Sequence, residues 1–249
     1  ISNGTKGADI TKKLGVIGGL GPIATAYFYE LIIKMTNAAT DQEHMEIIIY
    51  SRPSTPDRTE FILGRSKDNP VCPMLEAGRT LVGMGVDYIA IPCITAHYFH
   101  DILSEGINAP ILNIVKETVQ QLADHGVKCA GIMATEGTIQ SELFQKELSN
   151  YGITAVIPSK EKQELVTHLI YKNVKANQPV EMDKFNDASG ELRENGAEVI
   201  ILGCTELSLI KKDYKIGAGF IDAMEVLAMR SIQSCEGNLK EEYLSLITR

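Results

Sequence analysis

The segment Gly85-Val-Asp-Tyr-Ile-Ala-Ile-Pro-Cys93 returns later in the chain as Gly196-Ala-Glu-Val-Ile-Ile-Leu-Gly-Cys204. Glycine aligns with glycine, an acidic residue with an acidic residue, apolar residues with apolar residues, and cysteine with cysteine. The segments 14–21 and 130–137 match in the same way, each with a glycine at its second and eighth positions. Short apolar runs of this kind are typical of buried parallel strands. The sequence therefore predicts an internal duplication.

Strand-like and helix-like segments alternate regularly along the chain. Apolar runs predict strands at 14–18, 46–50, 88–92, 110–113, 130–134, 154–157, 199–202 and 218–221. Helical periodicity predicts helices at 23–37, 74–84, 97–103, 115–125, 138–151, 160–175, 181–195 and 223–234, the last with Asp222 as its N-cap. This alternation predicts an α/β fold of two pseudo-symmetric halves, each a parallel sheet flanked by helices.

The duplication divides the chain into two expected domains. The first comprises residues 14–114 together with 217–249, whose C-terminal helices are expected to pack back on it; the second comprises 115–216. Residues 1–13 are polar and are expected to form a tail outside both domains. The segment 51–70 is long, polar and rich in Pro, Asp and Arg. Because loops of this length in compact domains are usually functional or mobile, we expect a role for it at the site.

The composition excludes several classes of protein. The chain has 249 residues, 44% of them hydrophobic and 22% charged, which is ordinary for a globular protein and argues against disorder. No apolar run approaches the ~18 residues of a membrane helix, and at a net charge of −8 the scattered Lys and Arg form no basic stripe for nucleic acid. Five cysteines without a CxxC pair argue against a disulfide framework or a zinc ribbon. We therefore expect a protein of a reducing compartment, the cytoplasm, with neither nucleic acid nor membrane as partner.

Cys93 and Cys204 each follow a predicted strand and stand at the start of a helix. Ligands of open parallel sheets bind beyond the carboxyl ends of the strands, so we expect the two thiols to meet across one cleft. The N-terminus of a helix stabilises a thiolate and so lowers the pKa of a cysteine thiol from its reference value of about 8.5. Two facing thiols are consistent with a disulfide, a metal site, an acid–base pair, or two cysteines buried for packing.

The disulfide and the metal site are the weaker interpretations. A reducing compartment argues against a disulfide. A disulfide would also join the two halves across the cleft, which argues against it as well. His97 could join Cys93 in binding a metal, but the matching position in the second half is Ser208, so the motif is incomplete. A base and an acid on opposite faces of one carbon can move a proton from one face to the other, which is racemisation or epimerisation.

Several motifs, in order along the chain, resemble those of the aspartate/glutamate racemase family. The two cysteine segments, Pro92-Cys-Ile-Thr-Ala-His97 and Gly203-Cys-Thr-Glu-Leu207, are similar to the family's two signature segments. Gly18–Pro22 followed by Ala24-Thr25 resembles its opening glycine loop, Thr55–Thr59 its substrate loop and Ala134–Thr138 its threonine loop. The resemblance extends from Leu14 to the last helix. It implies two flavodoxin-like halves with the active site between them, no cofactor, a small acidic amino acid as substrate, and often a homodimer.

The resemblance also implies roles for individual residues. Cys93 and Cys204 would be the two bases. Arg58 would hold a substrate carboxylate by a bidentate fork, with Arg52 the weaker candidate for this contact. Lys175 matches by position a lysine that contacts substrate. Four threonines would supply hydroxyl or N–H groups to the α-carboxylate and stabilise its developing charge: Thr95, Thr135, Thr138 and Thr205.

Three further positions accompany these residues. Glu206 would orient Cys204 or relay its protons, unless it simply favours the helix N-terminus. His97 is expected to support or cap the site rather than to react. The family usually has Asn between the first Cys and the Thr, and here Ile94 stands in that place. This departure puts the identity of the substrate in doubt but leaves the two-thiol chemistry intact.

Other functions compete with racemisation. Gly19-Leu-Gly-Pro-Ile-Ala24 fits the dinucleotide-binding pattern G-x-G-x-x-A, but the second strand is followed by Ser51-Arg52-Pro53 instead of an acid for the ribose. The same site could serve other carbanion chemistry, namely isomerisation or decarboxylation of a diacid. A non-catalytic amino-acid-binding protein is a further possibility, although the presence of both cysteines argues against it.

Overall fold

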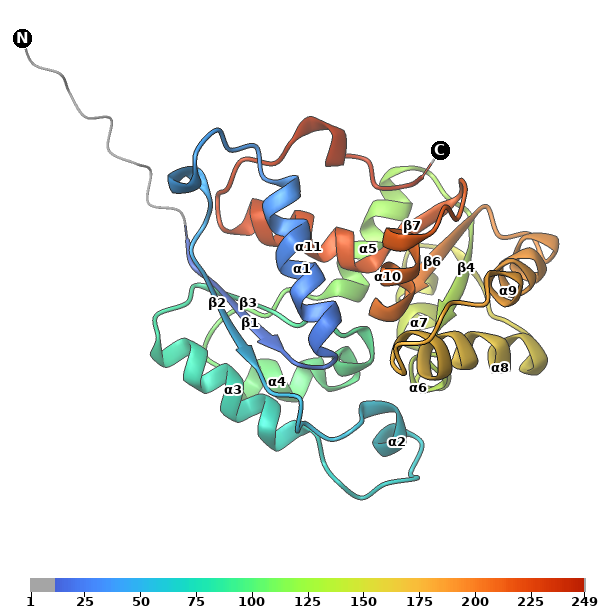
Figure 1. Cartoon of the computed structure of the whole chain (residues 1–249), viewed down its shortest axis with the longest axis horizontal. Coiled ribbons are helices and arrows are strands. Elements are labelled where there is room, and N and C mark those ends of the chain that lie inside the picture. Colours follow the sequence, from blue (N-terminus) through green and yellow to red (C-terminus); the bar gives the residue numbers. More distant parts are fainter. Residues whose placement is uncertain (1–11, 249) are drawn as a thin grey trace, which may run out of the picture.

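The computed structural model describes residues 12–248 and contains two parallel sheets flanked by helices (Figure 1). The first sheet has the order β2-β1-β3, and the second has the order β5-β4-β6-β7. An isolated parallel bridge between Ile89 and Ile111 extends the first sheet beside β3, where β7 stands in the second. The predicted α/β fold is thus confirmed. Of the predicted tail, residues 1–11 lie outside the described residues. The strands are β1 (Leu14–Gly18), β2 (Ile47–Ser51), β3 (Tyr88–Ala90), β4 (Cys129–Ala134), β5 (Thr154–Val156), β6 (Val199–Gly203) and β7 (Phe220–Asp222).

Matching glycines show how closely the two halves repeat each other. Gly15 of β1 lies so near Val86 that an added Cβ would stand 3.0 Å from that side chain. Gly131 of β4 lies in the same way against Ala197, at 3.1 Å. Val86 and Ala197 are themselves partners in the sequence repeat, and each lies just before the third strand of its half. In both halves, therefore, a glycine lets the first strand pack closely against the segment that leads into the third strand.

Helices connect the strands of each sheet. Those before β4 are α1 (Pro22–Met35), α2 (Arg58–Ile62), α3 (Val71–Gly83), α4 (His100–Gly106) and α5 (Ile114–Asp124), with the 3₁₀ segments η1 (Asp41–Glu43) and η2 (Ile94–Phe99). Those that follow are α6 (Glu136–Gln140), α7 (Leu143–Asn150), α8 (Lys160–His168), α9 (Met182–Glu194), α10 (Thr205–Asp213) and α11 (Ala223–Ser234), with the π-helical η3 (Leu169–Val174) and the 3₁₀ segment η4 (Glu241–Tyr243). Between residues 12 and 248, every helix is too short or too polar to cross a membrane.

Some predicted elements differ in detail from the structure. The expected helix 138–151 is two helices, α6 and α7, because Glu142 adopts a left-handed conformation with φ of 58° between them. The expected helix 160–175 changes after His168 into the π-helical η3. The expected strand 110–113 is reduced to the bridge at Ile111. The expected loop 51–70 contains the short helix α2, which begins at Arg58.

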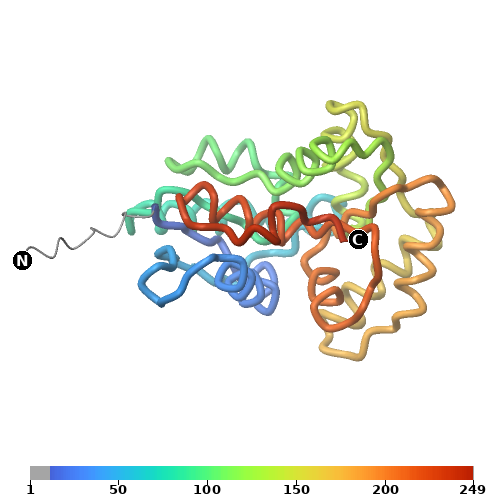
Figure 2. Tube along the Cα trace, turned by 90° about the horizontal axis from the view of Figure 1, so that it is seen from above, coloured from blue at the N-terminus to red at the C-terminus, as the bar shows by residue number. Residues whose placement is uncertain are grey.

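The largest hydrophobic core joins the two sheets. It includes Leu14 of β1 and Ile132 of β4, both fully buried, together with buried side chains of α1, α5 and α11. Helix α11 lies between α1 and α5, as Figures 1 and 2 show from two sides. Strand β7 pairs with β6 and so belongs to the second sheet, whereas α11 directly after it packs on α1 and α5. The domain boundaries at 114/115 and 216/217 remain a prediction.

Candidate active site

Cys93 and Cys204 lie at equivalent places in the two halves. Cys93 follows β3 and caps η2, and Cys204 follows β6 and caps α10. Both have extended backbones, with φ and ψ of −156° and 106° at Cys93 and −146° and 136° at Cys204. The side chains are 7% and 6% exposed, line one common cavity and are free thiols. The repeat thus delivers one thiol from each sheet to the same small space.

The cavity that both cysteines line is very small, about 20 Å³. It adjoins a groove of about 750 Å³ that lies between the glycine segment after β1, the segment 53–58, the residues after η3 and the end of α10. Five residues line both spaces: Leu20, Asp57, Arg58, Lys175 and Glu206. The described conformation is therefore closed around the thiols, with the wider groove on the far side of these five residues.

Arg58 reaches the cavity from α2, inside the polar segment 51–70. Asp57 caps this short helix by accepting a hydrogen bond of 3.0 Å from the Glu60 amide. The guanidinium donates to three backbone carbonyls, those of Thr55 (3.3 Å), Pro56 (2.8 Å) and Leu20 (2.9 Å). A guanidinium has five N–H groups, and the buried Nε is without a partner. One edge of the group, formed by Nε and an Nη2 hydrogen, therefore remains free for a ligand.

The charge of Arg58 is maintained at the site although its side chain is only 8% exposed. Burial lowers the pKa of this guanidinium, but the neighbouring Cys93 sulfur and Asp57 carboxylate raise it, and the net direction is upward.

Lys175, Glu206 and Cys204 form a second connected group at the cavity. The Lys175 Nζ lies 2.8 Å from Glu206 Oε1, and Glu206 Oε2 accepts a hydrogen bond of 2.9 Å from the Cys204 thiol. Glu206 is 5% exposed, so the pair is shielded from solvent. Burial lowers the pKa of Lys175, yet the Glu206 carboxylate raises it overall. Burial and the same carboxylate raise the pKa of Cys204 well above its ordinary value.

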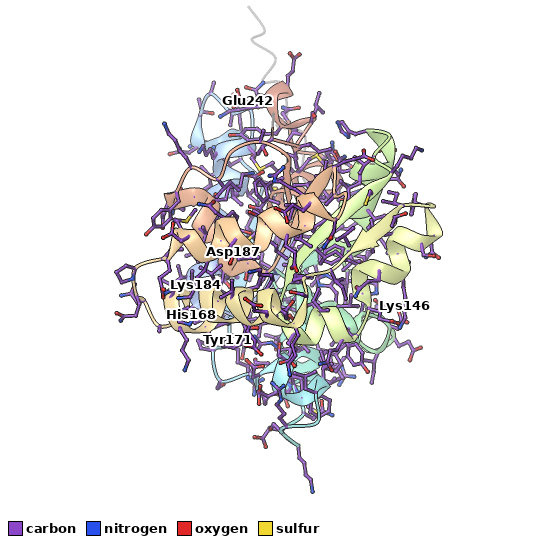
Figure 3. All side chains as sticks on the ribbon, turned by 90° about the vertical axis from the view of Figure 1, so that its right-hand side faces the viewer. Lys146, His168, Tyr171, Lys184, Asp187 and Glu242 are labelled. Carbon is purple, nitrogen blue, oxygen red and sulfur yellow. The ribbon has the colours of Figure 1, made fainter. Side chains whose placement is uncertain are left out.

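Tyr171, which the sequence analysis missed, also lines the cavity. It lies on η3, close to His168 (Figure 3) and four residues before Lys175 in the sequence. Its ring is 5.5 Å from the Lys175 Nζ, in cation–π range. Burial raises the pKa of Tyr171 to about 12, so the phenol stays protonated. A π-helical turn is often found at functional sites, and the spacing of Tyr171 four residues before Lys175 was the available signal.

The predicted threonines divide into two groups. The hydroxyls of Thr95, Thr135 and Thr138 form a buried triangle, with oxygen–oxygen distances of 2.9, 3.0 and 3.1 Å. Thr95 comes from the first half and the other two from the second, so the triangle fastens the halves together beside the cavity. Thr95 and Thr135 line the cavity, whereas Thr138 supports them from behind. Thr205 also lines it and donates to Glu206 at 3.2 Å.

Not every candidate lies in the cavity. Arg52 extends away from it and pairs with Glu76 of α3 at 2.6 Å. Ile94 does line the cavity, but its side chain is 1% exposed and packs into the large core. The described part of the chain has no three His, Cys, Asp or Glu side chains grouped so that they could hold a metal ion.

His97 supports the backbone beside Cys93. Its ring nitrogens lie 3.0 Å from the Cys93 carbonyl oxygen and 3.3 Å from that of Leu112. Burial lowers the pKa of His97 to about 4, so the imidazole is neutral near pH 7 and donates through one nitrogen, Nδ1 at the shorter distance. Its counterpart Ser208 bonds instead to Asp222, at 2.7 Å.

The glycines after β1 are explained by packing. Gly19 has a φ of 85°, and an added Cβ would stand 2.5 Å from the backbone nitrogen of Arg52. The loop must therefore lack a side chain here in order to pack on the end of β2. This close contact accounts for the apparent dinucleotide motif without a nucleotide.

The arrangement can exchange a proton on a small carboxylate-bearing molecule. Two thiols share one cavity, Arg58 presents a free edge beside Cys93, and Lys175 stands near Cys204. Cations and hydroxyls around a carboxylate stabilise the charge that develops when an adjacent carbon loses its proton.

Comparisons with known proteins agree with this chemistry. A family model described as Asp/Glu/hydantoin racemase matches residues 17–230. The chain is 29% identical over 227 residues to the broad specificity amino-acid racemase RacX of Bacillus subtilis, and the match covers 89% of this chain and 97% of that one.

Solved structures agree at the level of the fold. The aspartate racemase of Picrophilus torridus superposes with a TM-score of 0.83 at 32% identity, covering 93% of this chain and 97% of that one. The glutamate racemase of Francisella tularensis superposes with a TM-score of 0.65 at 17% identity, covering 90% and 81%, which supports the fold alone.

Proposed function

The chain belongs to the Asp/Glu/hydantoin racemase family and is an amino-acid racemase, and we propose that it inverts an acidic amino acid by a two-base mechanism with Cys93 and Cys204. The observation that carries this proposal is the shared cavity, in which one thiol from each half meets Arg58 and Lys175. Aspartate is the preferred substrate, and glutamate is the second candidate.

In each turnover, one proton leaves the substrate and another is returned. The thiolate of one cysteine takes the α-hydrogen as a proton, and the C–H electron pair remains on the substrate as a carbanion conjugated with its carboxylate. The thiol of the other cysteine then gives its proton to the opposite face of the same carbon. Each reacting contact needs about 3–3.5 Å, so the two sulfurs are expected to stand about 7 Å apart around a bound substrate.

Arg58 and Lys175 would hold the two carboxylates of the substrate. The free edge of Arg58 offers two parallel N–H donors, which suits a carboxylate held side by side. Lys175 would exchange its contact with Glu206 for the second carboxylate, and Thr95, Thr135 and Thr205 would donate hydroxyls to the first. Thr138 would keep the threonine triangle in place.

Substrate would enter through the groove. A cavity of about 20 Å³ has room for little more than one water, so an amino acid requires the five residues shared with the groove to move apart. The Arg58 segment is the natural moving part because it belongs to the polar connection 51–70, and Lys175 must in any case leave Glu206.

The test is α-proton exchange in heavy water. Enantiopure aspartate, glutamate and an apolar amino acid are incubated separately with the protein, and deuterium incorporation and inversion are followed by NMR and chiral chromatography. Exchange accompanied by inversion of aspartate is expected. Decarboxylation or isomerisation of a diacid without inversion of any amino acid would overturn the proposal, as would binding without exchange.

Two properties of the enzyme complete the proposal. The five cysteines are free thiols, which is consistent with work in a reducing compartment, the cytoplasm. Helix α1 exposes Ile23 near its start and Tyr29 and Ile33 on one face, apolar surface that a second copy of the chain would cover in a homodimer. Light scattering of the purified protein gives the mass in solution, and a monomer at micromolar concentration would contradict the dimer.

A further inference from the structure

Helix α2 carries an arginine at each end. Arg58, at its first position, lines the thiol cavity, and Arg65 lies just beyond its last turn. Gly64 has a φ of 70°, and its amide donates to the Phe61 carbonyl at 3.0 Å. The Arg65 amide donates to the Glu60 carbonyl at 2.9 Å. Because this pair of bonds is a Schellman motif, in which a left-handed glycine ends the helix, Arg65 is fixed to the same rigid element as Arg58.

One side of α2 rests on the first half of the molecule through apolar contacts. The Phe61 ring lies 5.9 Å from the Phe99 ring of η2. Phe61 and Ile62 also pack against the buried hydrophobic cluster that contains Ile89 of β3 and Cys93. This side of α2 is therefore attached to the half that supplies the first thiol.

The other side of α2 meets α6 of the second half along what we call the α2–α6 seam, formed by Thr59, Arg65, Glu136 and Gly137. The Arg65 Nη2 lies 2.9 and 3.0 Å from the two carboxylate oxygens of Glu136. At Gly137, an added Cβ would stand 3.0 Å from the Thr59 Cα. The two helices can therefore approach this closely only because residue 137 has no side chain.

The seam is placed to act on the cavity without touching its contents. Of the four residues that form it in the described chain, only Thr59 lines the thiol cavity. The side chains of Arg65 and Glu136 are 50% and 30% exposed and lie at the molecular surface. They can therefore act on a substrate only through α2, the helix that carries Arg58.

We infer, on the basis of the proposed racemase function, that the α2–α6 seam is the contact that closes the active site, and that Arg65 and Glu136 are positioning residues that hold Arg58 over the thiols. The cavity of about 20 Å³ has room for little more than one water, so an amino acid enters only after the seam parts. The apolar contact at Phe61 is not directional, so α2 can tilt on it while the seam breaks. When the seam forms again, it excludes water and returns the guanidinium to the substrate.

Alkylation of the active-site thiols measures this opening without reference to activity. Iodoacetamide does not fit in the closed cavity, so modification of Cys93 or Cys204 requires the seam to open. In Glu136→Gln, which removes the charge and keeps the size, both rates are expected to rise by the same factor, about twofold to fivefold, because the ion pair is exposed. In Gly137→Ala, whose Cβ would meet the backbone of Thr59, the common factor is expected to be about tenfold.

Matched controls separate the seam from general effects of the substitutions. Exposed Cys72 is the internal reference for the reagent. Lys162 and Asp187 form an ion pair of the same length, 2.9 Å, inside the second half, so Asp187→Asn is expected to change neither active-site thiol. An added Cβ at Gly190 of α9 meets nothing within 4 Å, so Gly190→Ala is the control for Gly137→Ala and is expected to have no effect.

Reversal of the ion pair distinguishes a positioning role from a loss of folding. Arg65→Glu and Glu136→Arg each place like charges together across the seam, and each is expected to raise both thiol rates. The combined variant restores an ion pair, and both rates are expected to return to within about twofold of wild type. Variants that had only lost folding stability would not be rescued in this way.

A covalent cross-link tests the seam in the opposite direction. The Cβ atoms of Thr59→Cys and Gly137→Cys would stand about 3.3 Å apart, near the range that a disulfide spans. In a Cys72→Ser background, the oxidised double variant is expected to lose thiol modification and racemisation together and to regain both on reduction. Cys72→Ser alone, oxidised in the same way, is expected to keep both.

The outcome can be separated from that of the proposed function. Thiol rates that rise in Glu136→Gln and Gly137→Ala, in a protein that exchanges no α-proton, would leave the seam standing and refute the racemase mechanism. Thiol rates that neither variant changes, or full racemisation by the oxidised cross-linked protein, would overturn the inference although the protein is a racemase.

Discussion

The Nη2 of Arg58 donates a hydrogen bond of 2.9 Å to the carbonyl oxygen of Leu20, which joins the polar segment after β2 to the glycine loop after β1. Both residues border the thiol cavity and the groove beside it. The bond holds a guanidinium whose buried Nε has no hydrogen-bond partner, and we propose that this edge binds a substrate carboxylate. In the proposed mechanism this geometry belongs to the closed state, which forms again around the substrate after the Arg58 segment has moved to admit it.

Replacement of Arg58 by lysine tests this recognition. A lysine keeps the positive charge but cannot form two parallel N–H bonds to one carboxylate. Charge-assisted hydrogen bonds contribute about 1.5–3 kcal/mol each, so Arg58→Lys is expected to raise KM for aspartate and to lower kcat/KM by about tenfold to a hundredfold. Steady-state kinetics with both enantiomers measure this.

The control is the nearby arginine that does not line the cavity. Arg52 pairs with Glu76 instead, so Arg52→Lys is expected to leave kcat/KM within about twofold of wild type. Equal losses in the two variants would show that the segment needs arginine for its folding and not for the substrate.

A substitution at Ile94 tests the proposed preference for an acidic substrate. Its apolar side chain lines the cavity where the family usually has Asn. If the acidic substrate lacks a contact here, Ile94→Asn raises kcat/KM for aspartate, and this is the expected result. The change also puts an amide into a core position that is 1% exposed, at a cost of about 1–3 kcal/mol in unfolding free energy if it finds no partner.

A panel of amino acids shows which role Ile94 has. Wild type and Ile94→Asn are compared on acidic and apolar amino acids under the same conditions. Higher activity of wild type on an apolar amino acid, lost in the variant, would mean that Ile94 forms a pocket for that side chain and that the acidic preference is wrong.

The sequence predicted the sheets and the thiol positions because these depend on local patterns. Apolar runs with Gly15 and Gly131 at their second positions, and apolar runs before the two cysteines, occur in the same order in both halves. Helix ends were less predictable. The left-handed Glu142 that separates α6 from α7 has no signal in the sequence, since glutamate favours a continuous helix.

The direction of individual side chains was the second feature that the sequence could not predict. Arg52 and Arg58 lie in the same polar segment, and their sequence contexts alone did not decide which one faces the thiols. The difference arises because Asp57 caps α2 and turns Arg58 inward, whereas the carboxylate of Glu76 holds Arg52 outward. Tyr171 was missed since its approach to the cavity depends on the wider π-helical turn of η3.

His97 predicts a pH dependence of stability. Its pKa of about 4 in the folded protein lies below the value of about 6.5 in an unfolded chain. Between these values the unfolded state binds the proton and the folded state does not, so stability is fully present above pH 6.5 and falls as the pH decreases toward 4. The loss at the acid end is about 3 kcal/mol.

Urea unfolding at several pH values checks this contribution. In His97→Gln the decrease in unfolding free energy between pH 6.5 and 4 is expected to be smaller than in wild type by up to about 3 kcal/mol. His125, which bonds to Gln121 and Ser245 at the exposed end of α5, supplies the control. A His125→Gln variant with the same flattened slope would contradict the assignment to His97.

Activity is expected without a metal or an organic cofactor. In the proposed mechanism the cysteines, Arg58 and the hydroxyls that line the cavity would provide the base, the acid and the charge stabilisation within the chain itself. Turnover is therefore expected to be unchanged after exhaustive dialysis against a chelator and after treatment with a carbonyl reagent that removes pyridoxal phosphate. Recovery of lost activity by an added metal ion or by pyridoxal phosphate would contradict this.

The most direct test of the two-base mechanism is α-proton exchange by the two single-cysteine variants. Each enantiopure form of aspartate is incubated in heavy water with wild type, Cys93→Ala and Cys204→Ala, and deuterium at the α-carbon is measured by NMR. Because each variant keeps one base on one face of the substrate, racemisation is expected to fall by about 10³-fold or more in both. Residual exchange is expected with one enantiomer in Cys93→Ala and with the opposite enantiomer in Cys204→Ala. Full racemisation by either variant, or residual exchange with the same enantiomer in both, would contradict the account.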